Sequence, residues 1–374
     1  MKYYLIAGER SGDLHASNLM DELSRIDNQP IFRGMGGGYM AKAGLQIAAH
    51  YEEVALMGFV EVLFGFRKVI RYLTLIKKDL LDFKPDALIL IDYGGFNMKI
   101  AKYASKMGIP VHYYIPPKVW AWNQRRALIL KKYVTSLYTI LPFEPDFFSG
   151  YNWEVPYVGN PICDELAKFN PNPNFTQENG LSHKPVIALL PGSRKQEVAG
   201  MLSTMLGVVK QFPQWNFVVA GVDNLPADIY QDAERYGIQT VFNQTYDLLH
   251  VAQAAVVTSG TATLETALFD VPQVVVYKTS PVTYQIAKHL VKIPFISLVN
   301  LIAEREVVRE LIQDAYHENQ LVKELSQIAE EGLPRQAVLK GYAEVRKKIG
   351  NKKASQETAR LIFESLSLTQ NQAT

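Results

Sequence analysis

Cysteine is almost absent from this chain of 374 residues, which holds only Cys163. No intrachain disulfide can form, as is usual in a reducing compartment. There is also no uninterrupted apolar run of about 18 residues, the length that a membrane-spanning helix requires. The apolar run near the N-terminus is too short for a signal peptide. Together these absences predict a cytoplasmic protein.

A strong charge of one sign is also missing. The sequence has 39 Lys and Arg against 37 Asp and Glu, a formal net charge of +2. So small an excess argues against nucleic acid as the main partner. The hydrophobic fraction of 48% and charged fraction of 20% are those of an ordinary globular protein. The length suggests two domains with large cores.

Several catalytic motifs are absent as well. No Walker loop GxxxxGK[ST] occurs, which disfavours ATP hydrolysis. No GxSxG nucleophile turn, HxxxH pair or Cys/His cluster occurs either, and no Asp-x-Asp. The sequence therefore predicts neither a metal nor a cofactor.

What the chain does contain is alternating strand-like and helical periodicity, in two halves. This alternation predicts parallel sheets with helices on both faces, an α/β fold. The Pro- and Asn-rich run at 168–180 is the best candidate for a linker or loop. The expected strands are 3–8, 87–92, 109–117, 185–192, 215–221, 238–243, 254–260 and 272–278, and the expected helices are 11–26, 94–108, 194–212 and 261–270.

Two glycine turns in the second half have the features of an anion site. PGSRKQE begins at Pro191 and follows an apolar strand; Gly192 permits a close turn, and Arg194 adds a charged donor. TSGTATLE (258–265) repeats the pattern, with Glu265 placed to accept hydrogen bonds from a ribose. The alternatives are that Ser193 only caps a helix and that Glu265 only interacts with a helix dipole. Two such turns in one domain favour a nucleotide diphosphate.

The first half carries a carboxylate at a strand end. Asp92 follows a buried strand and precedes Gly94 and Gly95, so it is a candidate general base or else a helix cap. AGERSGD (7–13) is a third strand-to-helix turn, whose acids suit neutral hydroxyl groups better than phosphate; the alternative is a capped helix start, with Ser11 or Asp13 as the cap. In PPKVWAWNQRR (116–126), the tryptophans form a sugar platform, contact an acyl chain or simply pack in the core.

The segment 55–73 is the most unusual in composition. It mixes aromatic and aliphatic residues with cations, and every charge after Glu61 is positive. Such a segment can lie on a membrane surface; the alternative is a buried core helix with basic ends. The membrane interpretation rests on Phe59, Val60, Leu63, Phe64, Phe66, Arg67 and Lys68.

Read in order, GERSGD, LMGFVEVL, LIDYGGFN, VWAW, LPFE, LLPGSRKQEV, SGTATLETAL and SLVNLIAEREVVREL resemble the lipid-A-disaccharide synthase family. Each motif alone is weak, but the ordered set covers nearly the whole chain. The resemblance implies the GT-B architecture, in which two Rossmann-like domains face each other across a cleft. The expected domains are 1–162, for acceptor and membrane, and 163–345, for the UDP-sugar, with a C-terminal helix at 346–374 packing back on the first.

The resemblance also implies a reaction. The family transfers 2,3-diacylglucosamine from UDP to the 6-hydroxyl of 2,3-diacylglucosamine 1-phosphate, with inversion, on the way to lipid A. Its members are peripheral proteins of the inner face of the inner membrane, need no metal and can form homodimers. Asp92 matches the base and Arg194 the arginine beside the departing diphosphate.

The remaining site residues follow from the same resemblance. Glu9 is expected in catalysis beside Asp92. The nucleotide-sugar residues are expected to be Gly192, Ser193, Arg194, Glu197, Ser259, Gly260, Thr261, Ala262, Glu265 and Asn300. The acceptor and first-loop residues are expected to be Ser11, Gly12, Asn97, Lys118, Trp120 and Trp122.

Some positions depart from the family pattern. Many relatives have a second acid where Gly95 stands, and a serine where Lys118 stands. Asn123 replaces a usual basic residue, so Lys118 is a candidate for the acceptor phosphate. Two other classes stay open: a GT-B enzyme acting on soluble sugar nucleotides, such as an epimerase or cell-wall transferase, and a non-catalytic sugar-nucleotide- or lipid-binding protein.

Overall fold

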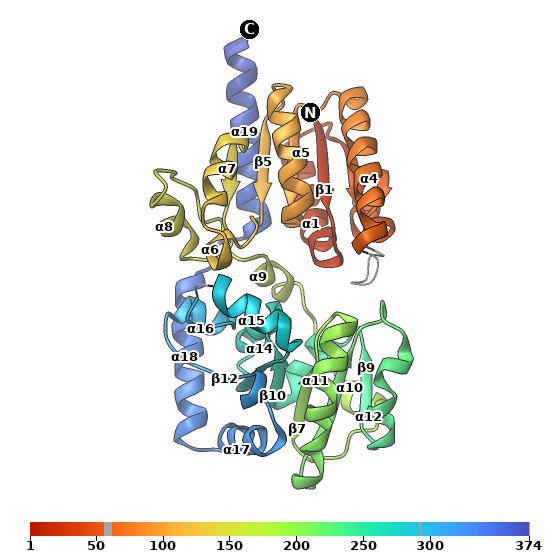
Figure 1. Cartoon of the computed structure of the whole chain (residues 1–374), viewed down its shortest axis with the longest axis vertical. Coiled ribbons are helices and arrows are strands. Elements are labelled where there is room, and N and C mark those ends of the chain that lie inside the picture. Colours follow the sequence, from red (N-terminus) through yellow and green to blue (C-terminus); the bar gives the residue numbers. More distant parts are fainter. Residues whose placement is uncertain (56–61, 292, 374) are drawn as a thin grey trace. The chain divides into compact units, whose positions relative to one another are not determined.

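The computed structural model describes residues 1–55, 62–291 and 293–373, and the chain divides into two compact units. The first comprises 1–167 with 351–374, and the second comprises 168–350. The divisions thus fall slightly later than the boundaries expected after residues 162 and 345. Each unit is an α/β domain built on its own parallel sheet (Figure 1).

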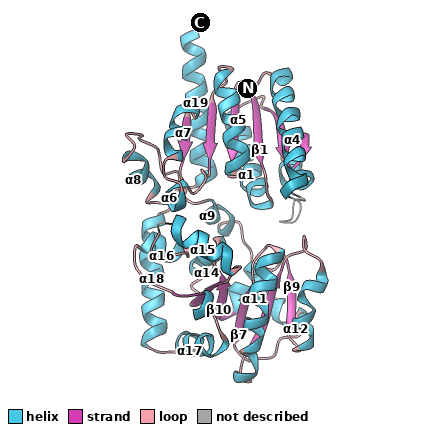
Figure 2. Cartoon of the chain, in the orientation of Figure 1, coloured by secondary structure: helices cyan, strands magenta, loops and turns pink. Residues whose placement is uncertain are grey.

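The sheet of the first unit has six parallel strands in the order β3-β2-β1-β4-β5-β6. Figure 2 shows the strands of each unit in magenta, with cyan helices beside them. The strands from β1 to β3 extend the sheet toward one edge, and those from β4 to β6 extend it toward the other. The strand order therefore reverses between β1 and β4, as in Rossmann folds. The strands are β1 (Lys2–Ala7), β2 (Ile31–Gly36), β3 (Gln46–His50), β4 (Ala87–Ile91), β5 (Val111–Tyr114) and β6 (Ser136–Tyr138).

Helices cover both faces of this sheet because alternate strand residues point to opposite sides. Tyr4 and Ile6 of β1 pack with α4, α5 and α7, whereas Tyr3 and Leu5 pack with α1 and the C-terminal helix α19. The helices are α1 (Arg10–Ile26), α2 (Gly38–Lys42), α3 (Tyr51–Ala55), α4 (Val62–Phe83), α5 (Gly94–Lys106), α6 (Val119–Trp122), α7 (Arg126–Tyr133), α8 (Glu144–Ser149), α9 (Pro161–Leu166) and α19 (Ala354–Ala373).

The second unit repeats the topology of the first. Its parallel sheet has the order β12-β11-β10-β7-β8-β9, with the reversal between β7 and β10. The strands are β7 (Val186–Leu190), β8 (Asn216–Gly221), β9 (Gln239–Phe242), β10 (Ala252–Thr258), β11 (Gln273–Tyr277) and β12 (Arg309–Ile312). The α-helices are α10 (Phe175–Glu178), α11 (Lys195–Gly207), α12 (Gln231–Arg235), α13 (Thr245–Val251), α14 (Thr261–Leu268), α15 (Pro281–Leu290), α16 (Leu298–Ala303), α17 (Glu318–Ala329) and α18 (Leu333–Ile349).

Two local expectations differ from the structure. The run at 168–180 is more than a linker: it contains the short helix α10, and Phe175 is buried in the core of the second unit with Val186 and Leu248. The C-terminal return begins later than residue 346, because α18 continues to Ile349 within the second unit. The returning helix is α19, which packs on α1.

The predicted α/β class, with two Rossmann-like sheets, is confirmed. The periodicity did not indicate β2, β3, β6 or β12. β2 contains two glycines, β6 has only three residues, and β3 and β12 are half-exposed edge strands. Within the described ranges, no helix is both long enough and apolar enough to cross a bilayer.

Candidate functional site

The predicted base lies at the point where the first sheet reverses its strand order. β1 pairs with β4 in a register that places Ala7 opposite Ile91. The chain leaves β1 into the turn that holds Glu9 and leaves β4 directly into Asp92. Ligands of open α/β sheets bind at such reversal points, beyond the carboxyl ends of the strands. Sheet topology therefore brings together two carboxylates that are far apart in the sequence.

Asp92 and Glu9 interact directly. Burial, then the charge of Glu9 and a hydrogen bond with it, raise the pKa of Asp92 to about 6. The charge of nearby Lys118 and a backbone hydrogen bond from Tyr93 act in the opposite direction. A carboxylate whose pKa is moved toward neutrality is a better proton acceptor at physiological pH than an ordinary aspartate.

The backbone at Asp92 adopts a conformation that is unusual for residues other than glycine. Asp92 and Tyr93 have φ values of 47° and 50°, both in the left-handed region. Such consecutive residues store strain that the surroundings must hold. Here the carbonyl oxygen of Asp92 accepts hydrogen bonds from the Tyr113 hydroxyl (2.6 Å) and from Asn97 Nδ2 (2.8 Å). These donors fix the direction in which the Asp92 side chain leaves the sheet.

Asn97 was expected near the acceptor, but its side chain is fully buried. Its Nδ2 also donates to the carbonyl oxygen of Ile91 at 3.2 Å. Asn97 therefore holds the backbone of the Asp92 turn from its buried side. Any influence on an acceptor would act through that backbone.

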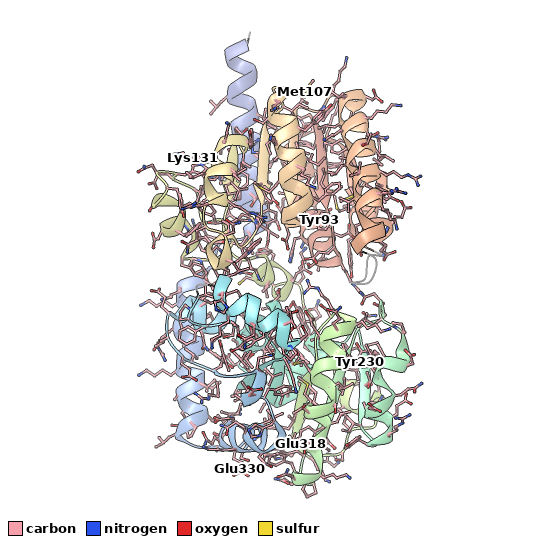
Figure 3. The ribbon with its side chains drawn as sticks, in the orientation of Figure 1. Tyr93, Met107, Lys131, Tyr230, Glu318 and Glu330 are labelled. Atoms are coloured by element: carbon pink, nitrogen blue, oxygen red, sulfur yellow. The ribbon has the colours of Figure 1, made fainter. Side chains whose placement is uncertain are left out.

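Close packing also shapes the turn from the other side. A Cβ on Gly8 would lie 2.1 Å from the ring of Tyr93, so only glycine fits there. Ser11 is exposed, and its hydroxyl donates to Glu9 Oε1 at 3.4 Å. Gly12 is buried in α1 against Ala7. Figure 3 labels Tyr93 at the start of α5, the end of the helix at which this turn lies.

The VWAW motif divides into one buried and one exposed tryptophan. Trp120 is buried, and its Nε1 donates at 3.0 Å to Glu144 of the LPFE motif. Trp122 is exposed, and the Arg126 guanidinium lies over its ring at 4.5 Å. Trp120 therefore packs in the core, whereas Trp122 remains available to a ligand. Lys118, just before the motif, is exposed.

Glu144 is a buried acid that the sequence did not single out. Its second carboxylate oxygen accepts hydrogen bonds from the backbone nitrogens of Ile140 (3.0 Å) and Leu141 (2.9 Å). Burial nevertheless raises its pKa to about 7. Glu144 thereby ties the VWAW helix to the end of β6.

The predicted membrane segment falls largely beyond the structural description. Phe59 and Val60 lie outside the described residues, and Leu63, Phe64 and Phe66 belong to α4 but to the part whose side chains are not described. Of the seven, Arg67 is exposed and Lys68 is half-buried.

In the second unit, both predicted anion turns lie at the reversal of the sheet. β7 pairs with β10, placing Leu190 opposite Val257. The turn from Gly192 follows β7, and the turn from Ser259 follows β10. Two turns far apart in the sequence thus share one sheet edge, where ligands of such folds bind.

In the first of these turns, a carboxylate of the protein already binds the backbone nitrogens that were expected to bind a phosphate. Glu197 accepts hydrogen bonds from the backbone nitrogens of Ser193 (3.0 Å) and Arg194 (3.3 Å), and it pairs with Arg194 Nη1 at 3.0 Å. Gly192 has φ 111°, and a Cβ there would approach the Glu197 carboxylate to 2.6 Å. Arg194, not Ser193, occupies the N-cap position of α11. The donors expected to hold a ligand phosphate are thus satisfied by Glu197.

The second turn is built from small residues. Gly260 is the N-cap of α14, and Thr263 Oγ1 donates to its carbonyl oxygen at 2.8 Å. Ser259 Oγ donates to the carbonyl of Ile296 at 2.8 Å. Thr261 is exposed and Ala262 half-buried. Their short side chains leave the N-terminus of α14 accessible to an anion.

Glu265 of α14 is half-buried and accepts a hydrogen bond from the Tyr246 hydroxyl at 2.9 Å. Asn300, by contrast, is fully buried: its Oδ1 accepts from the backbone nitrogens of Val307 and Val308, and its Nδ2 donates to Glu310 at 2.9 Å. Asn300 therefore organises the loop behind the second turn. Over the described parts of the chain, no cluster of His, Cys, Asp and Glu could hold a metal ion.

Comparison with known proteins decides the family. The family model described as Lipid-A-disaccharide synthetase matches residues 3–363. The chain belongs to the lipid-A-disaccharide synthase family. It is 35% identical over 370 residues to the lipid-A-disaccharide synthase of Geobacter metallireducens, covering 97% of this chain and 96% of that protein. The corresponding Myxococcus xanthus protein is 34% identical over 370 residues, with 97% of each chain covered.

Solved structures agree on the fold. The UDP-GlcNAc 2-epimerase from Neisseria meningitidis bound to UDP-GlcNAc superposes with a TM-score of 0.68 at 13% identity, covering 98% of this chain and 99% of that one. The calicheamicin glycosyltransferase CalG4 gives a TM-score of 0.61 at 15% identity, with 98% of both chains covered. At these identities the likeness shows the GT-B fold alone. Family membership makes this chain a glycosyltransferase.

Three supporting residues of this lipid-A-disaccharide synthase family member were missed from the sequence: Tyr113, Glu144 and Glu310. Each acts through contacts that only the folded chain creates. Tyr113 sits inside a strand that looks purely structural, and Glu310 meets Asn300 ten residues away across a loop. Glu144 belongs to the LPFE motif, and its position among apolar residues was the one sign in the sequence that its side chain is buried.

Proposed function

We propose that this enzyme transfers 2,3-diacylglucosamine from UDP to the 6-hydroxyl of 2,3-diacylglucosamine 1-phosphate. The products are a β-1′,6-linked disaccharide 1-phosphate and UDP. Family membership supports the substrates, and the position of Asp92 supports the chemistry. The observation that carries the proposal is the Asp92–Glu9 pair at the sheet reversal, because it gives a carboxylate with the pKa that a base for a hydroxyl group requires.

In the proposed step, Asp92 removes the proton of the acceptor 6-hydroxyl as its oxygen attacks the anomeric carbon of the donor. The new bond forms on the face opposite to the bond that breaks, so the configuration inverts. The electron pair of the broken bond stays with the leaving UDP. Lys118 is exposed and close enough to Asp92 to affect its pKa, so its ammonium can receive the acceptor phosphate.

The departing diphosphate is bound by the two turns of the second unit. Arg194 and the N-terminus of α14 stabilise the negative charge that develops on UDP. When the diphosphate binds, it replaces the Glu197 carboxylate at the backbone nitrogens of Ser193 and Arg194. Glu265, which accepts a hydrogen bond from the Tyr246 hydroxyl, also accepts one from the ribose of the bound donor.

Both substrates carry acyl chains, so the enzyme works at a membrane surface; the family resemblance supports a peripheral location on the inner face of the inner membrane. The segment 55–73 contacts the membrane, as its mixture of apolar residues and cations suggests. Changing Phe59, Leu63 and Phe66 to serine should lower vesicle binding more than UDP binding. Unaltered vesicle binding would favour a buried role for this segment.

Mass-spectrometric product analysis tests the reaction. The chain is incubated with UDP-2,3-diacylglucosamine and 2,3-diacylglucosamine 1-phosphate in detergent micelles. The expected product is the disaccharide 1-phosphate, formed together with UDP. Donor consumed without disaccharide, or UDP-GlcNAc epimerised under the same conditions, would instead support a soluble sugar-nucleotide enzyme.

A further inference from the structure

Three aromatic side chains of the second unit gather beside Glu265, and their rings have no role in the reaction proposed above. Tyr246 lies in the first turn of α13, and Phe269 directly follows α14. Phe169 belongs to the segment 168–180, which was expected to be a linker or loop. The ring centroids of Phe169 and Tyr246 are 5.6 Å apart, those of Phe169 and Phe269 are 5.5 Å apart, and those of Tyr246 and Phe269 are 5.3 Å apart. The three rings form a closed aromatic triangle.

The packing of the aromatic triangle fixes the Tyr246 ring. The planes of the Phe169 and Tyr246 rings meet at 90°, and those of the Phe169 and Phe269 rings meet at 77°. This edge-to-face arrangement is one that aromatic pairs prefer. All three side chains are half-buried, and Phe269 also packs on the core that contains Leu248. The direction in which the Tyr246 hydroxyl points is therefore set by its two aromatic neighbours.

The segment that supplies Phe169 is attached to α13 at a second point. The backbone nitrogen of Asn172 donates a hydrogen bond of 2.7 Å to Asp247 Oδ1. Asp247 is the residue after Tyr246 in α13. The Asn172 bond and the Phe169 ring are thus two attachments to the first turn of α13. This part of the expected linker belongs to the frame of the second unit.

The hydroxyl of Tyr246 acts on Glu265. It donates a hydrogen bond of 2.9 Å to Glu265 Oε1. A hydrogen bond to a carboxylate is stronger than one between neutral groups, so it favours one orientation of the flexible glutamate side chain. A carboxylate has about four acceptor positions on its two oxygens. The bond from Tyr246 is therefore compatible with further bonds from the hydroxyl groups of a ligand.

Glu265 lies one helical turn beyond the candidate phosphate site. Thr261, at the N-terminus of α14, precedes it by four residues, so the two lie on one face of the helix, about 6 Å apart along its axis. Helices α13 and α14 follow β9 and β10 and so begin at the same edge of the sheet, where ligands bind. A diphosphate bound at the N-terminus of α14 would bring its ribose to Glu265.

We propose that Tyr246, held by Phe169 and Phe269, is a positioning residue for ribose recognition, which makes the second unit select nucleoside diphosphates with a complete ribose diol over those with a deoxyribose. The inference rests on the proposed function, in which Glu265 accepts a hydrogen bond from the ribose of UDP. A ligand that lacks the bonded hydroxyl leaves an oriented carboxylate without that donor. Sites built in this way reject such analogues strongly.

Isothermal titration calorimetry of the full chain tests this role with UDP, 2′-deoxy-UDP and 3′-deoxy-UDP. Selectivity is the Kd of a deoxynucleotide divided by the Kd of UDP. The variants are Tyr246→Phe, Glu265→Gln and the two combined. The matched control is Tyr342→Phe, because the buried Tyr342 hydroxyl bonds the carbonyl oxygen of Val271 before the start of β11, at the opposite edge of the same sheet. Melting temperatures establish that each variant is folded.

We expect the parent to bind UDP at least about tenfold more tightly than one of the two deoxynucleotides, the factor that one hydrogen bond to a charged group supplies. Tyr246→Phe should lower this selectivity to about threefold, since a less oriented carboxylate forms a weaker bond to the ribose. The affinity for that deoxynucleotide should change little. Adding Tyr246→Phe to Glu265→Gln should lower the selectivity no further, because the hydroxyl acts through the carboxylate. The control should keep the parent's selectivity.

Two results would overturn the proposal. Equal weakening of UDP and deoxynucleotide binding by Tyr246→Phe would mean that the tyrosine only stabilises the fold. A further loss of selectivity in the combined variant would mean that Tyr246 acts on the ribose without Glu265. Phe169→Leu should lower the selectivity in the same direction as Tyr246→Phe, and an unchanged selectivity would overturn the role of the aromatic triangle.

Product analysis with the acylated substrates separates this role from the proposed reaction. A parent that selects UDP through Tyr246 but forms no disaccharide would contradict the transferase reaction and leave the positioning role standing. A parent that forms the disaccharide but binds UDP and both deoxynucleotides equally would support the reaction and overturn the positioning role.

Discussion

The phenolic hydroxyl of Tyr113 donates a hydrogen bond of 2.6 Å to the main-chain carbonyl oxygen of Asp92. Tyr113 belongs to β5, the strand next to β4, and is fully buried. The bond therefore connects the core of the first sheet to the left-handed turn that presents the proposed base. It makes the position of the proposed catalytic carboxylate depend on a residue buried in the core.

Tyr113→Phe should lower kcat about tenfold with little change in either KM, because a small displacement of a base weakens the transition state more than substrate binding. The free energy of unfolding should fall by about 1 kcal/mol. Tyr3→Phe is the matched control, since its buried hydroxyl bonds Asp27 elsewhere in the unit. Equal losses of kcat in both variants would show that Tyr113 acts only through stability.

The pH dependence of kcat/KM, which reports the titrating groups of the free enzyme, should reveal the Asp92–Glu9 pair. Asp92 must be ionised to accept a proton, so activity should rise with pH through about 6, the raised pKa of its carboxyl group. Glu9→Gln removes the neighbouring negative charge, lowers the pKa of Asp92 and moves this rise to lower pH. Lys118→Ala removes a positive charge, raises the pKa of Asp92 and moves it to higher pH. Shifts in the same direction for the two variants would contradict the assignment.

Glu144→Gln should destabilise the first unit by about 1 to 3 kcal/mol at pH 4.5, because an amide nitrogen must face either Trp120 or two backbone donors. The pKa of Glu144 is raised to about 7, so the folded parent holds a proton that the unfolded chain releases near pH 4.5. The parent's stability from this group is therefore present below 4.5 and is lost as pH rises to 7. The difference in the free energy of unfolding between the parent and Glu144→Gln should therefore become smaller between pH 4.5 and 7.

Denaturant unfolding at pH 4.5, 6 and 8 measures this difference. Glu154→Gln, an exposed position in the same unit, serves as the control and should show no comparable dependence on pH. A constant difference for Glu144→Gln across the range would mean that the carboxyl group does not titrate there.

Glu197→Gln should bind UDP several-fold more tightly than the parent, as measured by calorimetry. The parent must displace a carboxylate from the backbone nitrogens of Ser193 and Arg194, and that carboxylate then repels the diphosphate. Glu234→Gln, exposed in the same unit, is the control for net charge. Weaker UDP binding by Glu197→Gln would mean that Glu197 is needed to shape the turn for its ligand.

Much of this arrangement could be predicted from the sequence. Apolar runs ending in glycine turns identified the central strands and the two turns of the second unit, and an acid after a buried strand identified Asp92. These features are local. Edge strands such as β3 were missed, because a half-exposed strand lacks the apolar run that marks a buried one.

The roles of side chains that depend on contacts in the folded chain could not be predicted from the sequence. Asn97 and Asn300 were expected at ligands, yet both are fully buried and bond the backbone. Glu197 was expected to help bind the nucleotide, and in the structure it takes the donors of the turn itself. Polar residues beside a ligand site and polar residues that build it look alike in sequence, since both stand next to glycine turns.

The most direct test of the account is the turnover of Asp92→Asn, measured with both acylated substrates in micelles alongside UDP affinity. Asparagine has nearly the shape of aspartate but cannot accept the proton of the acceptor hydroxyl. The account predicts a loss of kcat of about a thousandfold, with UDP binding and melting temperature at or above those of the parent. A kcat within tenfold of the parent, in a folded variant that binds UDP normally, would contradict the assignment of Asp92 as the base.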